Sequence, residues 1–419
     1  MLAVETFPAN LHIFDDGLSV VHQHLPSAPI VTVDVWVRAG AIAEPNAWAG
    51  MAHFLEHMIF KGTDRFPPGY FDQVIETRGG VTNAATSHDY AHFFIDIASS
   101  YLGDGLEHLA ELLVRASIPD AEFEREREVV LEELRQAQDD PDWVGFQALM
   151  ESVYPTHPYG RSVLGTEETL MGRSPQDMRQ FHRRYYQPEN MTVVVVGDVE
   201  LDATLESVRQ SFCGFLPRLP ESQPVSYQNA PMHGLRRQEM GLARIEEARL
   251  LMAWQGPGVD KIHDAYGLDL LSVALAGGRS SRLVRELREE KQWVHAVGSN
   301  FSLQRDSSLF TISAWLEPQY LQATEDLIGD RLRQLAAQPL DVSELNRYKR
   351  LLCNDYAFST ETSNQLAGLY GYYSTITKPT IATTYPAHIQ SFKPEELQHL
   401  ARKYLSTDRY AATILKPLT

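Results

Sequence analysis

The chain has 419 residues, of which 43% are hydrophobic and 22% are charged. This length exceeds what a single hydrophobic core usually serves, so two globular domains are expected. Acidic residues outnumber basic ones by 55 to 37, and the net charge of −18 argues against nucleic acids and anionic membrane surfaces as partners.

The first half of the chain begins with strand-like segments and then alternates between helices and strands. Residues 18–24 and 30–38 have the β-branched content of strands, and Asp15-Asp16-Gly17 is typical of a hairpin turn. Residues 50–60, GMAHFLEHMIF, are rich in good helix formers and predict a helix. Further helices are expected at 71–77, 102–116 and from 120 to the break at Pro141, and further strands at 83–98 and 191–197.

The second half repeats this coarse order after a linker. Residues 217–240 contain four prolines among polar residues and show no apolar period, which predicts a linker. Beyond it we expect a strand at 248–255, a helix at 265–276, a mixed-charge helix, strands within 294–316, and helices at 318–337 and 341–360. The sequence thus predicts an α+β fold of two similar domains, 1–216 and 241–419, each a mainly antiparallel sheet with helices packed on one face.

The cysteines and the lack of long apolar runs indicate the cellular compartment in which the protein is expected. Cys213 and Cys353 form no Cys-x-x-Cys pair, and two cysteines make no disulfide framework. The first residues lack a basic stretch followed by an apolar one, and no apolar run approaches the roughly 18 residues of a spanning helix. We therefore expect a soluble, cytoplasmic protein without a membrane partner.

The predicted helix at 50–60 carries a metal-binding pattern. His53 and His57 are four residues apart, so on a helix their rings lie on one face and can hold one ion. Glu56 lies beside that face, where it can act as general base on a water molecule without being a ligand. His-Phe-Leu-Glu-His is the reversed zincin motif. The alternative is two histidines satisfied by hydrogen bonds inside a buried helix.

A third zinc ligand has to come from elsewhere, and the acidic helix after Asp120 offers several. Glu126 and Glu133 are seven residues apart and share one face, while Glu132 is rotated by about 100° from Glu133. Residue spacing alone leaves Glu132 and Glu133 equally good candidates. For most acids of this helix, a solvated surface position is the simpler interpretation.

Several segments resemble one known family of peptidases. HFLEHMIFKGT (53–63) is similar to the active-site helix of the family of pitrilysin, insulysin and the mitochondrial processing peptidase. The resemblance covers nearly the whole chain, and it is most specific in the first half. It extends through GGVTNAATS (79–87), EREVVLEEL (126–134), HPYGRSVLGT (157–166) and YYQPENMTVVVVGDV (185–199), and more weakly through GGRSSRLVRELREE (277–290).

The resemblance implies specific roles at the predicted zinc site. It places the distal ligand on Glu133 rather than Glu132, and it assigns to Glu126 the support of a histidine ligand. Domain 1–216 would then be the zinc-binding catalytic domain. Domain 241–419 would complete a substrate chamber, which in this family is enclosed by two such chains facing each other.

The resemblance also implies substrate-binding residues. Asn83, Ala84 and Ala85 match the strand edge on which an extended peptide is bound by backbone hydrogen bonds. In the second domain, Arg288 matches the first member of an Arg/Tyr pair that binds substrate, but His295 stands where the tyrosine is expected. Some relatives obtain that pair from a partner subunit, so a homodimer and a heterodimer both remain open.

Together, these features predict a zinc-dependent endopeptidase with one Zn²⁺ per chain. Its substrates would be unfolded peptides or terminal extensions, because strand addition requires an extended chain. The alternative is a non-proteolytic scaffold subunit of a larger assembly. The presence of all four residues of the predicted centre, His53, Glu56, His57 and Glu133, argues against that alternative.

Overall fold

The computed structural model describes residues 7–219, 227 and 231–418. The chain divides into two compact units, and neither is continuous in sequence. Unit 1 comprises Met1–Arg135, Arg161–Ser226 and Ser359–Thr383, and unit 2 comprises Gln136–Gly160, Tyr227–Phe358 and Thr384–Thr419. The boundaries predicted at 216 and 241 follow the repeat of elements along the sequence, whereas these two units are defined by contacts in space. The predicted boundaries therefore stay a prediction.

Unit 1 is built on a six-stranded sheet with the order β1-β2-β6-β3-β5-β4. Its strands are β1 (Asn10–Ile13), β2 (Ser19–His24), β3 (Ile30–Val37), β4 (Val81–Thr86), β5 (Ala91–Ala98) and β6 (Met191–Gly197). Only β2 and β6 are parallel, and every other neighbouring pair is antiparallel. The predicted hairpin turn is present, with Gly17 at a φ of 96° that suits glycine.

The segment predicted as one strand at 83–98 is a hairpin of two strands. β4 and β5 are joined by a tight turn in which the Ser87 N–H donates to the Tyr90 carbonyl oxygen. The expectation of one strand was wrong because the alternation of side chains continues through the turn. As a result β4 lies at an edge of the sheet, with a neighbour on one side only.

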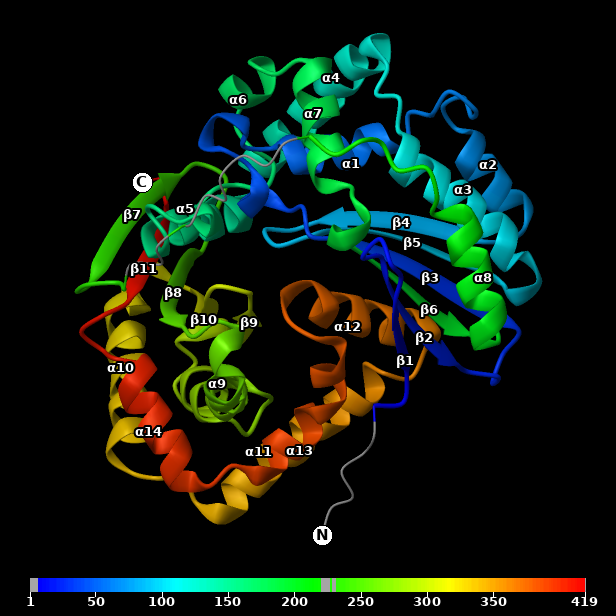
Figure 1. Ribbon diagram of the computed structural model, residues 1–419. Helices are drawn as coiled ribbons and strands as arrows, with labels where there is room; N and C mark the ends of the chain where they lie inside the picture. Colours follow the sequence, from blue (N-terminus) through cyan, green and yellow to red (C-terminus); the bar gives the residue numbers. More distant parts are fainter. Residues whose placement is uncertain (1–6, 220–226, 228–230, 419) are drawn as a thin grey trace. The chain divides into compact units, whose positions relative to one another are not determined.

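The alternation of side chains along β3 assigns the two faces of this sheet to different helices. Thr32 and Trp36 point to the face covered by α12 (Ser363–Ile376), where Thr32 Oγ1 lies 3.0 Å from Ser363 Oγ. The opposite face, which includes Ile95 of β5, is covered by α1 (Met51–Ile59), α2 (Tyr70–Thr77) and α3 (Leu102–Arg115) (Figure 1). The other helices of unit 1 are α4 (Asp120–Asp139, which ends in unit 2), α6 (Glu167–Met171), α7 (Pro175–Tyr185) and α8 (Leu201–Ser211).

Unit 2 repeats the strand order of unit 1. Its five-stranded sheet has the order β7-β11-β8-β10-β9, which corresponds to β2-β6-β3-β5-β4 and has no counterpart of β1. Again only one pair is parallel, here β7 and β11. The strands are β7 (Arg236–Leu242), β8 (Ala248–Gly256), β9 (Val294–Leu303), β10 (Ser308–Leu316) and β11 (Ala411–Pro417). The predicted α+β class with two similar, mainly antiparallel sheets is therefore confirmed. β7 begins within the predicted linker, because its alternation of polar and half-buried residues was not recognised as a strand.

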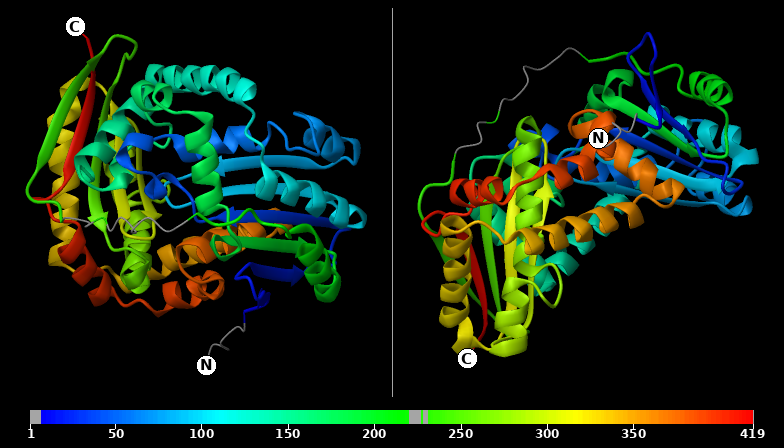
Figure 2. Two further views of the ribbon diagram at one scale, coloured as in Figure 1. Left: turned by 45° about the horizontal axis from the view of Figure 1, so that its top comes forward. Right: turned by 90° about the horizontal axis from the view of Figure 1, so that it is seen from below.

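Figure 2 shows helices of unit 2, coloured yellow and red, beside the sheet of this unit. One helix of the unit departs from α geometry. The α-helices of the unit are α5 (Pro141–Val153), α9 (Ile262–Ala276), α10 (Leu321–Ala337), α11 (Val342–Phe358), α13 (Tyr385–Ser391) and α14 (Pro394–Tyr404). The predicted mixed-charge helix is a π-helix, Val284–Glu290. Helix α5 packs on β11 and β8, as α12 packs on β6 and β3 in unit 1. None of the helices in the described part of the chain combines the length and apolar character that a bilayer crossing requires.

The packing of α12 on β3 leaves no room for a side chain at Gly371, because an added Cβ would lie 1.9 Å from Trp36 Nε1. We expect Gly371→Ala to lower the free energy of unfolding by about 1–3 kcal/mol through overpacking. Gly368 of the same helix is the matched control, since a Cβ there meets nothing within 4 Å. Gly368→Ala should leave stability unchanged or raise it by up to about 1 kcal/mol. Denaturant unfolding curves test both, and equal effects would contradict this packing.

Candidate metal centre

Helix α1 places His53 and His57 on one face because its other residues are fixed by burial. Phe54, Leu55 and Met58 are buried completely, and the Phe54 ring packs against Phe123 of α4 with a centroid distance of 4.6 Å. The two histidine rings therefore turn toward the acidic side chains of α4. His53 itself is only 8% exposed, so its imidazole is a polar group inside the unit.

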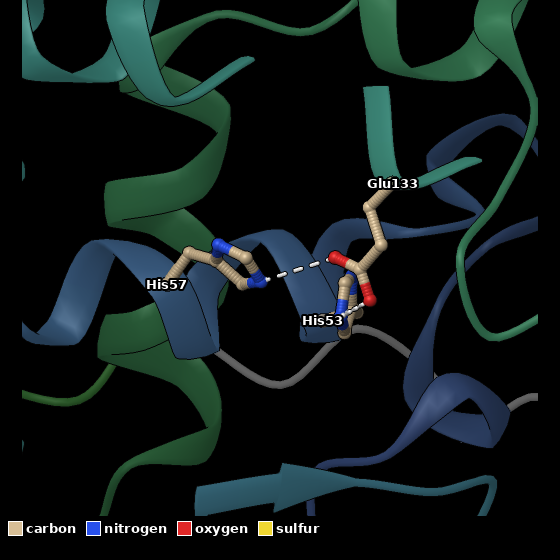
Figure 3. A group of neighbouring side chains, drawn as sticks. All are labelled: His53, His57 and Glu133. Atoms are coloured by element: carbon tan, nitrogen blue, oxygen red, sulfur yellow. Dashed lines mark ion pairs between the residues drawn. The ribbon is translucent and has the colours of Figure 1, made fainter. Parts of the chain in front are cut away.

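The structure brings His53, His57 and Glu133 together around one point. Glu133 reaches from α4 toward both rings (Figure 3). One carboxylate oxygen lies 3.6 Å from His53 Nε2 and the other lies 3.4 Å from His57 Nε2. One donor atom of each residue lies within 4.8 Å of those of the other two. Two ligands at about 2.0–2.1 Å from a tetrahedral Zn²⁺ are roughly 3.4 Å apart, so this spacing fits the ion.

A second acid of α4 holds the orientation of the His57 ring. Glu126 Oε1 lies 2.9 Å from His57 Nδ1, and since a carboxylate only accepts, Nδ1 carries the hydrogen. The other Glu126 oxygen lies 2.6 Å from the ammonium of Lys61. This arrangement directs Nε2 of His57 toward Glu133 and leaves that nitrogen as the one available to a metal.

The charges around the rings favour a cation. Burial lowers the pKa of His57, but its hydrogen bonds to Glu126 and Glu133 outweigh burial and raise the pKa to about 9. Burial lowers the pKa of His53 to about 4, so this ring is neutral and ready to be a ligand. A proton on His57 thus occupies the place that a metal ion would take, and metal binding would release it.

Glu56 lies beside the three residues without joining them. Its Oε2 accepts a hydrogen bond of 2.5 Å from the Thr86 hydroxyl at the end of β4. Burial raises the pKa of the Glu56 carboxyl, against the hydrogen bond from Thr86 and the charge of His57. A half-buried carboxylate with a raised pKa, next to a metal-binding group, has the properties of a general base.

The predicted peptide-binding residues lie on the edge strand β4. Asn83 and Ala85 are exposed and Ala84 is half-buried. Asn83 Oδ1 accepts the backbone N–H of Ala84 at 2.9 Å. β4 pairs with β5 alone among the described strands, so the backbone groups on its other side are available to an added strand.

Arg288 and His295 lie in unit 2, each beside an acid. The Arg288 guanidinium donates to Glu289 at 2.7 and 3.0 Å from within the π-helix. His295 Nε2 of β9 lies 3.4 Å from a carboxylate oxygen of Glu247. Their roles in substrate binding stay predictions.

Three residues of the site were not anticipated from the sequence. Lys61 lies just beyond the end of α1, where helical spacing no longer applies, and its pairing with Glu126 is a tertiary contact. Thr86 and Glu44 carry no sequence signal for their roles. Thr86 binds Glu56, and Glu44 binds the backbone at the start of α1.

Comparisons with known proteins agree with this geometry. Residues 19–167 match the family described as insulinase (peptidase family M16), and residues 174–352 match the peptidase M16 inactive domain. An uncharacterized zinc protease of Mycobacterium leprae is 30% identical over 96% of this chain and 90% of its own length. The zinc protease PqqE of Helicobacter pylori is 30% identical over 96% of this chain and 91% of its own length.

Two solved structures have the same fold as this chain. The crystal structure of a protease from Helicobacter pylori superposes with a TM-score of 0.92 at 28% identity, covering 98% of this chain and 100% of that one. A Pseudomonas fluorescens structure titled as a peptidase M16 inactive domain has a TM-score of 0.85 at 20% identity, covering 98% of both chains, and this similarity concerns the fold.

The geometry distinguishes Glu133 from its neighbour Glu132, which is exposed and paired with Arg135 at 3.3 Å. We expect Glu133→Gln to weaken zinc binding by more than about 100-fold, because it removes a charged ligand rather than a supporting group. Glu132→Gln is the matched control and should leave the zinc dissociation constant unchanged. Competition titrations with a chromophoric chelator measure both. Equal loss in the two variants would disprove the choice of ligand.

Proposed function

Because this chain belongs to the insulinase family of M16 peptidases, we propose that it is a zinc-dependent endopeptidase whose single ion is held by His53, His57 and Glu133. The observation that carries the proposal is the 3.4–3.6 Å spacing of the Glu133 oxygens from the two ring nitrogens, with the Glu56 carboxylate beside them. Among the described residues this is the group with metal-ligand geometry, and unit 2 offers no counterpart.

The proposed reaction divides the work between the ion and the side chains of α1. Zinc, when bound, would lower the pKa of water and polarise the peptide carbonyl. Glu56 accepts a proton from the attacking water and returns it to the leaving amine, and the Thr86 hydroxyl holds its carboxylate in place. Glu126 keeps the hydrogen of His57 on Nδ1, so that the ring presents Nε2 to the ion.

The free edge of β4 supports an extended peptide as substrate. A chain that adds beside Asn83 and Ala84 uses backbone hydrogen bonds, which exist only where the substrate is unfolded. The end of the same strand holds Thr86, the partner of Glu56, so a peptide bound at this edge runs toward the proposed base. Unfolded peptides or flexible terminal extensions are therefore the proposed substrates.

A dimer is proposed as the working form, with the second domain of this chain or of a related partner completing the site. Arg288 and His295 are the candidates for substrate contact in unit 2. A non-proteolytic scaffold role is the second candidate, since residues 174–352 match a domain described as inactive. That match is compatible with catalysis, because His53, Glu56, His57 and Glu133 all precede it.

Glu56→Gln separates catalysis from metal binding. It keeps the size of the side chain and a hydrogen bond to Thr86 but removes the base, so we expect cleavage to fall by about 10²–10⁴-fold with zinc still bound. Glu128→Gln, an exposed acid of α4, is the matched control and should cleave normally. Metal analysis and the rate of hydrolysis of a quenched fluorescent peptide library measure the two properties. Undiminished cleavage by Glu56→Gln would refute the assigned base.

Removal of the metal distinguishes the proposed peptidase function from the proposed scaffold function. We expect dialysis against a chelator to abolish peptide cleavage, and one equivalent of Zn²⁺ per chain to restore it, because Glu56 needs a water molecule whose pKa a bound ion would lower. The assay is run with the chain alone over a range of concentrations and with candidate related subunits. A zinc-loaded chain that cleaves nothing under any of these conditions favours the scaffold.

A further inference from the structure

A buried acid contacts the start of α1, the helix that carries the two proposed histidine ligands. Glu44 is 1% exposed and belongs to the loop before α1. Its Oε1 accepts the Ala52 N–H at 2.7 Å, and its Oε2 accepts the Gly50 N–H at 3.1 Å. Burial raises the pKa of Glu44 to about 8, whereas these hydrogen bonds and the charge of Arg161 lower it.

Helix α1 has few hydrogen-bond acceptors of its own for the backbone N–H groups of its first turn. It is only nine residues long, its N-cap is Gly50, which makes no side-chain cap, and its first turn contains no acid. The first N–H groups of any helix lack partners within the helix, and leaving them unpaired in the interior costs free energy. Glu44 provides the missing acceptor from outside the helix.

The loop that carries Glu44 is itself held by a distant segment. The Arg161 guanidinium donates to the carbonyl oxygens of Ala41 at 2.7 Å and Glu44 at 3.1 Å, and to Asn46 Oδ1 at 2.8 Å. A few residues on, the backbone at Gly165 approaches the loop so closely that a Cβ would lie 2.4 Å from the Ala49 carbonyl oxygen. These contacts give a structural role to residues 161–165 of the segment HPYGRSVLGT: they hold the loop before α1.

We infer that Glu44, supported by Arg161, is a positioning residue of the metal centre: it fixes the first turn of α1, and with it the ring of His53. His53 directly follows Ala52, whose N–H Glu44 binds, so a shift of this turn moves the ring. A shift of a few tenths of an ångström is enough to move a zinc ligand out of bonding distance. The inference rests on the proposed function only in assuming that the three residues bind zinc.

The test compares two buried acids of unit 1. Glu44→Gln keeps one acceptor oxygen but turns the other into an amide that cannot accept a backbone N–H. We expect zinc to bind about tenfold more weakly, and the visible absorption of the Co²⁺-substituted protein to change in position or intensity. Glu111→Gln is the control, because Glu111 is 2% exposed and accepts from Arg65 and Arg115 away from α1. It should lower the melting temperature and leave both metal readouts unchanged.

Three outcomes are decisive. If Glu44→Gln lowers the melting temperature but keeps the wild-type zinc affinity and Co²⁺ spectrum, Glu44 is structural only and the inference is wrong. If wild type itself binds no zinc, the proposed function fails instead. Should Glu44→Gln not fold, hydrogen exchange in the wild type decides. The amides of Gly50 and Ala52 should then be among the slowest in unit 1, and rapid exchange there would overturn the inference.

Discussion

The candidate site depends on the packing of α1 against α4. The contact between Phe54 and Phe123 brings the acidic face of α4 over the histidine face of α1. The two Glu133 oxygens then lie 3.6 and 3.4 Å from His53 and His57. Burying the His53 ring costs free energy that an apolar side chain would not, so the arrangement suits the proposed cation site better than a role in stability.

The surrounding residues each constrain one property of this group. Glu126 and Lys61 set which nitrogen of His57 faces the centre, and Thr86 holds the Glu56 carboxylate beside it. Glu44 anchors the first turn of α1 from the preceding loop. The proposed ligands, the proposed base and their supports thus come from four separated parts of the sequence, and all of them belong to one compact unit.

The repeat in the fold explains why the two compact units do not coincide with the two halves of the sequence. Both sheets have the same strand order with one parallel pair, and each receives one helix on equivalent strands, α12 on β3 and β6, and α5 on β8 and β11. Yet α12 comes from the second half of the sequence and α5 from the first. A linear boundary based on composition cannot reveal such an exchange, because each helix is amphipathic in its own right and carries no mark of the sheet it covers.

The sequence by itself determined what local spacing controls: the helix at 51–59, the common face of His53 and His57, and the two similar α+β halves. It left Glu132 and Glu133 undecided, and only the resemblance to a family favoured Glu133. Tertiary structure separated these two acids, since the rotation of α4 about its axis is set by packing against α1 and not by its own residues. The partners of Glu56 and of the α1 backbone were decided in the same way, because Thr86 and Glu44 meet α1 only when strands and loops distant in sequence fold around it.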